Sequence, residues 1–297
     1  MTTAWLAQRE HSTFVIVRTC AWLGARVGWH AGRAAVFLIC VYYFVRLKAQ
    51  HAASRRYLTA ALGRRARLLD VFRRYHTFAC TIHDRIFFLS GQYRNYSVTV
   101  HGEETFADLK ARGQGCILLG AHLGSFDVVR TLGIAEQSLP IRVLMYPDNS
   151  PRFSAVQNAL NPSLAKSIIP IGSPTAMLEV KEWIEDGGMV GILGDRIVHG
   201  EKLLRVPFLG AEAAFPAGPF IIASILKVPI VLFFGLNQGR RRYDIHFEVL
   251  THGIEASRAD RDAAIEEHVR EFAGRLEHYC RQAPYNWFNF YDFWTKS

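Results

Sequence analysis

After the first hundred residues, short apolar runs alternate with amphipathic stretches, and this alternation limits the possible folds more than any other feature of the chain. The apolar runs predict strands at Ser97–Val100, Cys116–Leu119, Ile141–Met145, Ser167–Pro170, Met189–Leu193, Val228–Phe234 and Ile245–Val249. The amphipathic stretches predict helices at Glu103–Ala111, Asp127–Glu136, Arg152–Ala159, Thr175–Glu185 and Pro219–Leu226, and one long helix at 259–280. Because buried strands that alternate with helices pair in parallel, the sequence predicts an α/β fold with a mainly parallel sheet and helices on both faces.

Charge divides the chain into two parts. Residues 1–100 hold fifteen Lys and Arg against three acidic residues, whereas residues 101–297 hold twenty against twenty-three. We therefore predict a basic, apolar, helical membrane-docking region at 1–95 and an α/β domain at 96–297. The five cysteines are far apart and form no C-x-x-C pair, which argues against a disulfide framework or a zinc ribbon and favours a reducing compartment.

The basic region does not contain a clean transmembrane segment. Phe14–Val45 is mostly apolar, but its longest uncharged piece, Ala34–Val45, has only twelve residues, and a spanning helix needs about 20. At helical spacing, Arg18, Arg26 and Arg33 fall on one face, which is typical of a helix lying in a bilayer interface. Gly24, Gly28 and Gly32 recur every four residues; they indicate either close approach of another helix or a flexible, kinked segment.

Arginines then alternate with leucines, in the order Arg55-Arg56, Arg64-Arg65, Arg67 and Arg73-Arg74. Such a run binds polyanions, and the apolar segment before it favours anionic lipid headgroups. Nucleic acid is a minor alternative, because no zinc-finger spacing, RNP aromatic pattern or helix-turn-helix signal accompanies the charge. A solvated helical face without a partner is the plain alternative.

One histidine has the surroundings of a catalytic base. His122 lies in Gly120-Ala121-His122-Leu123-Gly124-Ser125-Phe126-Asp127, directly after a predicted strand and before a predicted helix, where parallel sheets carry their chemistry. A carboxylate on one ring nitrogen would fix the tautomer and leave the other nitrogen free to take a proton from an alcohol or amine. His-x-x-x-x-Asp also occurs by chance, and a satisfied histidine at a strand end is the alternative.

No residue of the chain stands out as a nucleophile, so the substrate would supply it. No serine lies in a G-x-S-x-G elbow, and Ser125 lacks the second glycine of that motif. Gly113 and Gly115 precede their strand, which excludes a dinucleotide loop. A second polar cluster, Gly194-Asp195-Arg196, follows another strand; it is either a structural ion pair or a guanidinium presented to a phosphate or carboxylate.

Two later segments complete the pattern. Val206–Gly210 and Phe215–Phe220 predict a loop that turns into a helix with proline near its start. The aromatic segment Pro284–Trp294 indicates either packing over the edge of the domain or contact with a membrane interface.

The order of these motifs resembles that of the lysophospholipid acyltransferase superfamily: the His122 block, then Gly194-Asp195-Arg196, Phe208-Leu209-Gly210 with Phe215-Pro216-Ala217-Gly218-Pro219, and Val228-Pro229-Ile230. More closely, it resembles the late lipid A acyltransferases and their relatives encoded with polyene pigment and glycolipid pathways in Gram-negative bacteria. The resemblance implies His122 as general base, Asp127 as its orienting acid, Asp195 and Arg196 near a substrate phosphate, and Pro229 in the final block. With it, the candidate substrate-binding residues are Gly124, Ser125, Met145, Gly194, Asp195 and Arg196.

The implied reaction moves a fatty acyl group directly from a thioester, on acyl carrier protein or coenzyme A, to a hydroxyl of a lipid A-like, glycolipid or pigment-lipid acceptor. It needs no metal or organic cofactor and would take place at the cytoplasmic face of the bacterial inner membrane. Gly194-Asp195-Arg196 stands in place of the Glu-Gly-Thr-Arg of relatives that acylate glycerol phosphate, which weakens the case for such acceptors. The alternative class is a noncatalytic lipid-binding or complex-forming membrane protein that keeps the fold.

Overall fold

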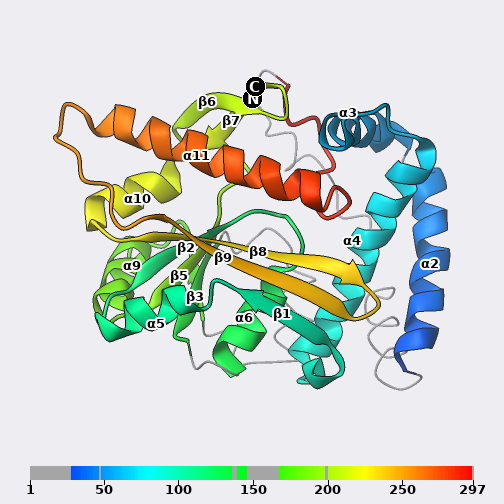
Figure 1. Cartoon of the computed structure of the whole chain (residues 1–297), viewed down its shortest axis with the longest axis horizontal. Coiled ribbons are helices and arrows are strands. Elements are labelled where there is room, and N and C mark those ends of the chain that lie inside the picture. The colour runs from blue at the N-terminus through cyan, green and yellow to red at the C-terminus, as the bar shows by residue number, and fades with distance from the viewer. Residues whose placement is uncertain (1–27, 47, 136–138, 146–166, 198–199, 296–297) are drawn as a thin grey trace.

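A seven-stranded sheet forms the centre of the computed structural model, which describes residues 28–46, 48–135, 139–145, 167–197 and 200–295 (Figure 1). Its strands are β1 (Ser97–His101), β2 (Cys116–Gly120), β3 (Ile141–Met145), β4 (Ile168–Pro170), β5 (Met189–Leu193), β8 (Ile230–Gly239) and β9 (Arg242–Thr251). They lie in the order β1-β9-β8-β2-β5-β3-β4, and only β8 and β9 pair antiparallel. The predicted mainly parallel α/β fold is thus confirmed.

Helices cover both faces of this sheet. They are α5 (Glu104–Ala111), α6 (Phe126–Ala135), α9 (Ala176–Glu185), α10 (Gly218–Leu226) and α11 (Arg261–Gln282). Figure 1 shows α10 and α11 on one side of the sheet and α5 and α6 on the other. Each matches a predicted helix to within two residues at either end, whereas the helix predicted at Arg152–Ala159 lies outside the described residues.

The strand pattern explains why both faces are apolar. Along β2, Ile117 and Leu119 belong to the core under α9, α10 and α11, whereas Cys116 and Leu118 belong to the core under α5 and α6. Successive side chains of a strand point to opposite faces, so an uninterrupted apolar run supplies both cores at once. All five residues of β2 are buried.

One predicted segment has a different structure. The stretch expected to be a loop leading into a helix is a two-stranded antiparallel hairpin of β6 (Leu203–Phe208) and β7 (Ala211–Pro216). Val206 and Phe208 are completely buried, whereas Arg205 and Pro207 are exposed, so the segment alternates with the period of a strand. The hairpin turns at Leu209 and Gly210, which both have positive φ, and α10 begins directly after it.

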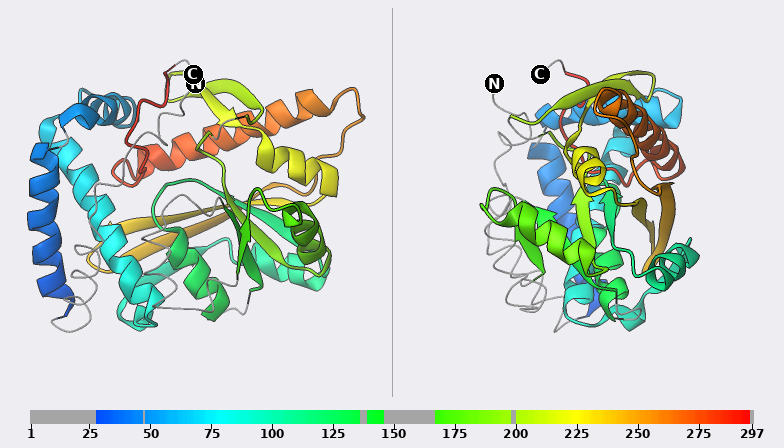
Figure 2. Two further views of the ribbon diagram at one scale, coloured as in Figure 1. Left: turned by 180° about the vertical axis from the view of Figure 1, so that it is seen from behind. Right: turned by 90° about the vertical axis from the view of Figure 1, so that its left-hand side faces the viewer.

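In the described part of the basic region, residues 28–46 and 48–95, the chain forms three α-helices, α2 (Trp29–Arg46), α3 (His51–Leu62) and α4 (Leu68–Leu89), with short 3-10 turns at Lys48–Gln50 and Tyr93–Asn95. Tyr57 and Leu58 of α3 and Val71 of α4 belong to the same apolar core as the sheet. Figure 1 and the left view of Figure 2 show α2 outermost, with α4 between it and the sheet. No single described helix is long and apolar enough to cross a membrane; α2 and α3 pass that test only as a pair, bent by 108°.

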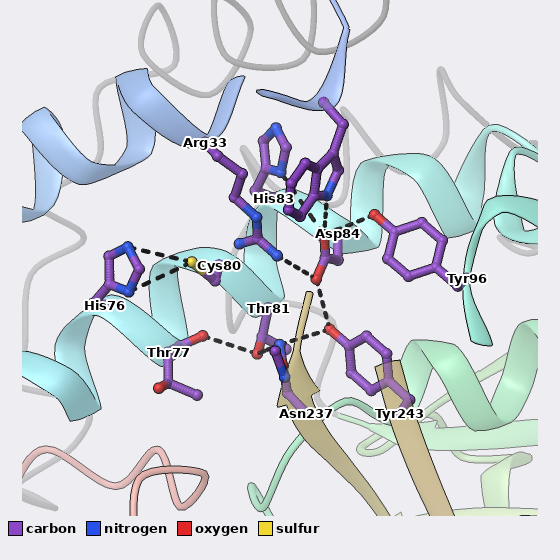
Figure 3. A network of polar contacts seen from close by, with 12 residues as sticks. Arg33, His76, Thr77, Cys80, Thr81, His83, Asp84, Tyr96, Asn237 and Tyr243 are labelled. Atoms are coloured by element: carbon purple, nitrogen blue, oxygen red, sulfur yellow. Dashed lines mark hydrogen bonds and ion pairs between the residues drawn. The ribbon is translucent and has the colours of Figure 1, made fainter. Parts of the chain in front are cut away.

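A buried carboxylate joins these helices to the sheet. Figure 3 shows Asp84 of α4 at the centre of a polar network between α2 and the β8–β9 hairpin. It accepts hydrogen bonds from Trp29 Nε1 (3.2 Å), Arg33 Nη2 (2.7 Å), Tyr96 Oη (2.7 Å) and Tyr243 Oη (3.1 Å). Four donors on one carboxylate offset the cost of burying its charge, so the network fixes α2 against the domain.

Of the three regularly spaced glycines, Gly32 lies in α2 and has a local structural explanation. A Cβ atom at this residue would lie 2.2 Å from Nε2 of His83 in α4, so only glycine lets the two helices approach this closely. Gly28 has open space and a φ of +95°, and Gly24 lies outside the described residues, as do Arg18 and Arg26. Close helix approach is confirmed at Gly32.

Candidate active site

The site lies where β2 and β5 end. These strands pair in parallel with Gly120 opposite Leu193, so the loops that follow them emerge side by side at one edge of the sheet. The amide of Gly194 donates to the carbonyl of Gly120 at 2.9 Å. This bond extends the pairing of the two strands by one residue beyond the end of β5. This topology brings together His122 and Asp195, which are 73 residues apart in the sequence.

His122 and Asp195 form a close pair. Nδ1 of the imidazole lies 2.7 Å from Oδ1 of Asp195, and the backbone amide of His122 donates to Oδ2 at 2.9 Å. The His122 side chain is 26% exposed, whereas the carboxylate is fully buried. A buried carboxylate therefore holds one nitrogen of a ring that remains partly exposed.

Asp127, which we expected to orient His122, has a different partner. It lies in the first turn of α6, where Oδ2 is 2.5 Å from Nε of Arg85 in α4 and Oδ1 has no hydrogen-bond partner. In this structure Asp127 therefore pairs with Arg85, while Nδ1 of His122 lies against Asp195, and the role of Asp127 as orienting acid stays a prediction. The Arg85–Asp127 ion pair joins α4 to α6.

Two side chains that the sequence did not single out complete the surroundings of Asp195. Trp287 Nε1 and Asn289 Nδ2 both donate to Oδ2, at 2.9 and 2.8 Å. They come from residues 286–289, which we call the C-terminal strap and which crosses the His122 loop. The only sequence signal for them was their position inside an aromatic segment, which does not distinguish a polar role from packing.

The strap is bonded to the His122 loop along its backbone. The amide of Phe288 donates to the carbonyl of His122 at 2.7 Å, and the amide of Gly124 donates to the carbonyl of Asn286 at 2.9 Å. Arg196 bonds to the same segment, with Nε on Asn289 Oδ1 at 2.9 Å and Nη2 on Phe288 O at 3.3 Å. Asp195 and Arg196 thus both contact Asn289.

The remaining predicted binding residues have structural contacts of their own. Gly124 has a φ of +73°, and a Cβ there would lie 1.9 Å from the carbonyl oxygen of Gly235, so this turn requires glycine. Ser125 is buried; its amide donates to that same carbonyl, and its Oγ accepts from the Val128 amide at the start of α6. Met145 ends β3, two strands from β2 in the sheet, and its carbonyl accepts from Ile171. Binding of substrate by these residues stays a prediction.

Most of the C-terminal aromatic residues pack inside the protein. Trp287, Phe288, Phe293 and Trp294 are buried, and Trp287 packs edge-on against Phe208 of the hairpin at a centroid distance of 5.4 Å. This confirms packing over the domain edge for these side chains. Packing of Trp287 and Phe288 adds to the backbone hydrogen bonds between the strap and the His122 loop.

The electrostatics favour a neutral imidazole beside an ionised carboxylate. Burial lowers the pKa of His122 below its ordinary value of 6.5, and the nearby charge of Arg196 lowers it further, while Asp195 opposes both. For Asp195, burial alone would raise the pKa, but the charge and hydrogen bond of His122, together with Arg196 and Trp287, lower it overall. At neutral pH the Nδ1 proton then lies toward Asp195, and Nε2 carries a lone pair.

This arrangement suits removal of a proton by Nε2 from a group that enters beside the ring. Within the described residues, no cluster of three or more His, Cys, Asp or Glu is arranged to hold a metal ion. The four described cysteines, Cys40, Cys80, Cys116 and Cys280, are buried free thiols. Burial raises the pKa values of Cys40 and Cys116 to about 12, which keeps these thiols protonated and poorly nucleophilic.

A comparison with protein families matches this chain to the model of the bacterial lipid A biosynthesis acyltransferases, across residues 44–296. The matched stretch runs from the end of α2 to the C-terminus and contains the His122 loop, Asp195 and the strap. None of the curated proteins compared with the chain matches it.

Proposed function

Since the chain belongs to the bacterial lipid A biosynthesis acyltransferase family, as its motifs indicated, we propose that it moves a fatty acyl group from a thioester to a hydroxyl of a lipid. The proposed acceptor is a lipid A-like molecule, a glycolipid or a pigment lipid, and the proposed donor is an acyl thioester of acyl carrier protein, with coenzyme A as the alternative. The observation that carries the proposal is the accessible imidazole of His122 held through Nδ1 by a buried Asp195.

In the proposed mechanism, His122 is the general base. Nε2 takes the proton of the acceptor hydroxyl while the hydroxyl oxygen bonds to the thioester carbon. The tetrahedral intermediate then expels the thiolate, which takes the proton back from the imidazolium, so the products are an ester and a free thiol. Base catalysis of this kind contributes about 10² to 10⁴ in rate. Holding donor and acceptor together contributes further, because the reaction becomes unimolecular.

We propose Asp195, in place of Asp127, as the residue that orients this base. Its charge is adjacent to Nδ1, so it stabilises the imidazolium that forms when Nε2 accepts a proton. Full burial of the carboxylate strengthens that interaction, because little water screens it.

The exposed surface of α2 supports a position at the cytoplasmic face of the inner membrane. Gly32, Val36 and Cys40 face inward, and the opposite side carries an exposed row that we call the α2 apolar strip: Phe37, Leu38, Val41, Tyr42 and Val45. Leu68 and Leu69 at the start of α4 are exposed too, and the exposed arginines 65 and 67 precede them. Apolar side chains beside cationic ones fit a surface of anionic lipid, and the same cations would attract an acidic carrier protein.

The test replaces the base while keeping its shape. A strain that lacks the gene is complemented with the wild type, with His122→Gln or with His268→Gln, a histidine on α11 bonded to its own helix, and its lipids are compared by mass spectrometry. We expect one acylated lipid species to return with wild type and His268→Gln and to be absent with His122→Gln at equal protein level. Return of that species with His122→Gln would refute the proposed base and favour a noncatalytic lipid-binding role.

A further inference from the structure

Arg74 of α4 is a completely buried arginine whose direct hydrogen bonds go to backbone carbonyls rather than to a carboxylate. Nε donates to the carbonyl of Trp287 at 2.9 Å, and Nη2 donates to the carbonyl of Asn289 at 2.5 Å. The guanidinium also lies 4.5 Å from the ring centroid of Tyr57 and 4.7 Å from that of Phe290. A buried cation is costly, and an apolar side chain would fill this space without that cost.

The two carbonyls belong to the residues whose side chains hold Asp195. Trp287 and Asn289 donate to Oδ2 of Asp195 through Nε1 and Nδ2, while their carbonyl oxygens accept from Arg74. Phe288, between them, points its backbone groups the other way, to His122 and Arg196. Alternate residues of an extended segment point in opposite directions. One guanidinium that binds both carbonyls therefore fixes the backbone of the strap at the two residues whose side chains contact Asp195.

We propose that Arg74 is a positioning residue for the active site, which acts on His122 through the C-terminal strap and Asp195. The inference rests on the proposed function, because it assigns Arg74 a role in orienting the proposed base. With the strap fixed, Oδ2 of Asp195 stays occupied by three N–H donors, and Oδ1 remains available to Nδ1 of His122. A displaced strap would free the carboxylate to rotate, and the ring would lose its fixed tautomer.

Alternative roles make different predictions. If Arg74 only fills the core, its replacement lowers stability and leaves the chemistry of the folded molecules unchanged. If it positions the strap, the conservative variant Arg74→Lys already disturbs the site, because an ammonium is a single point of charge and cannot hold two carbonyls in the fixed geometry of a guanidinium.

The experiment compares the wild type with Arg74→Lys, Arg74→Gln, Asn289→Ala and the double variant Arg74→Lys with Asn289→Ala. Tyr285→Phe is the matched control, because it removes another polar contact between α4 and the C-terminal segment, the 2.9 Å bond from Tyr285 Oη to Asp70, away from Asp195. Full-length protein is assayed for acyl transfer to the precursor, still carrying the free hydroxyl, of the acylated lipid species found by complementation. The His122 tautomer is read by nitrogen NMR of ring-labelled histidine, with His122→Gln used to assign the signal.

We expect Arg74→Lys to lower kcat by about tenfold to a hundredfold with little change in KM, as displaced catalytic groups do. The His122 signal should change from one tautomer to an average of two, and the double variant should lose no more activity than the worse single variant. Tyr285→Phe should retain wild-type kcat and tautomer. If the lysine variant does not fold, kcat and the His122 tautomer are measured instead in Arg74→Gln, which can still donate to one of the two carbonyls.

A folded Arg74 variant with wild-type kcat and a single His122 tautomer would overturn the inference. So would losses that multiply in the double variant, because independent losses mean that Arg74 does not act through Asn289. Failure of the proposed function gives a different pattern, in which His122→Gln itself transfers the acyl group as well as the wild type.

Discussion

At the scale of single residues, the hydrogen bonds of Asp195 determine which nitrogen of the neutral His122 ring carries the proton. Oδ2 accepts from the His122 amide, Trp287 and Asn289, and Oδ1 faces Nδ1 of the ring. In Asp195→Asn, the amide oxygen would take the place of Oδ2 to keep these three donors, which places the NH₂ group against Nδ1. Nδ1 would then accept, the ring proton would move to Nε2, and Nε2 could no longer act as a base.

We therefore expect Asp195→Asn to fold and to lose about 10²- to 10⁴-fold in kcat. Steady-state acyl-transfer kinetics measure this loss, and nitrogen NMR of the histidine rings should show the changed tautomer. Asp127→Asn is the comparison, because its partner is Arg85 and it should leave the His122 tautomer as in the wild type. An Asp195→Asn enzyme with full kcat would mean that the carboxylate does not orient the base.

If His122 is the base, as proposed, its lowered pKa sets the pH dependence of the reaction. Only the neutral ring accepts a proton, so kcat/KM should be constant around neutrality and should fall as the pH drops through a value below 6.5. Arg196→Gln removes a positive charge that lowers this pKa, so its acid limb should move to higher pH, whereas Arg196→Lys should keep the limb in place. An Arg196→Gln profile with an unmoved acid limb would contradict this account.

Sequence spacing predicted His122 as the base but did not predict the carboxylate that lies against its ring, and the physical reason lies in the fold. Asp127 is five residues from His122, but it lies in the first turn of α6 and pairs with Arg85. Asp195 comes next to His122 only because β5 pairs with β2. Trp287 and Asn289 approach from the far end of the chain, and no local pattern encodes that contact. The sequence could predict that His122 and Asp195 each follow a strand. It could not predict that they contact each other, because that depends on the order of the strands in the sheet.

At the scale of elements, the contact between α2 and α4 depends on one missing side chain. The Cβ of an alanine at residue 32 would lie 2.2 Å from Nε2 of His83, and the His83 side chain is 1% exposed, so it has little room to move. We expect Gly32→Ala to lower the free energy of unfolding by about 1–3 kcal/mol, as overpacked cores do. Gly274→Ala on α11 faces open space and should instead stabilise by roughly 0.5–1 kcal/mol, because alanine is the better helix former.

Urea unfolding of both glycine variants measures these changes, and hydrogen exchange along α2 shows whether the loss is local to that helix. Equal stabilisation by both alanines would mean that α2 does not pack on His83 as described.

The sequence predicted best those helices and strands whose pattern of apolar and polar residues fits only one kind of secondary structure. The all-apolar run Met189–Leu193 is β5 with the predicted bounds, because such a run fits a strand that is buried on both faces. The β6–β7 hairpin was missed, because Pro207 and Pro216 with nearby glycines suggested a loop, although the side chains of Arg205–Phe208 alternate between exposed and buried. Proline is tolerated here, since a two-stranded hairpin leaves every strand with a free edge.

At the scale of the whole molecule, the basic helices and the α/β sheet are joined more closely than their charge contrast suggested. The composition predicted helices near the N-terminus, but it could not show that Tyr57 and Val71 share a core with the sheet or that Asp84 bonds to Tyr243 of β9. These contacts join residues that are far apart in the sequence. The residues next to them in the sequence form no motif that would predict such a contact. As a result, the proposed membrane-docking surface and the active site are parts of one packed unit.

That arrangement predicts how the whole protein binds membranes. The α2 apolar strip should insert into the interface while the nearby arginines contact anionic headgroups, each worth about 1 kcal/mol near the surface. Sedimentation with vesicles that contain anionic phospholipid should therefore be strong at low salt and weaker at high salt, because salt screens the charges. Vesicles of neutral lipid should bind much less protein.

Leu38→Glu tests the surface directly, because Leu38 is the most exposed residue of the strip, at 69%. Leu178→Glu on α9 is the matched control, since Leu178 is a leucine of similar exposure, 54%, on a helix that covers the sheet. Leu38→Glu should lower the fraction bound to anionic vesicles several-fold, because it buries a charge in the interface, and Leu178→Glu should bind as the wild type does. Equal loss in both variants would mean that total charge governs binding, and loss only in Leu178→Glu would place the docking surface on α9.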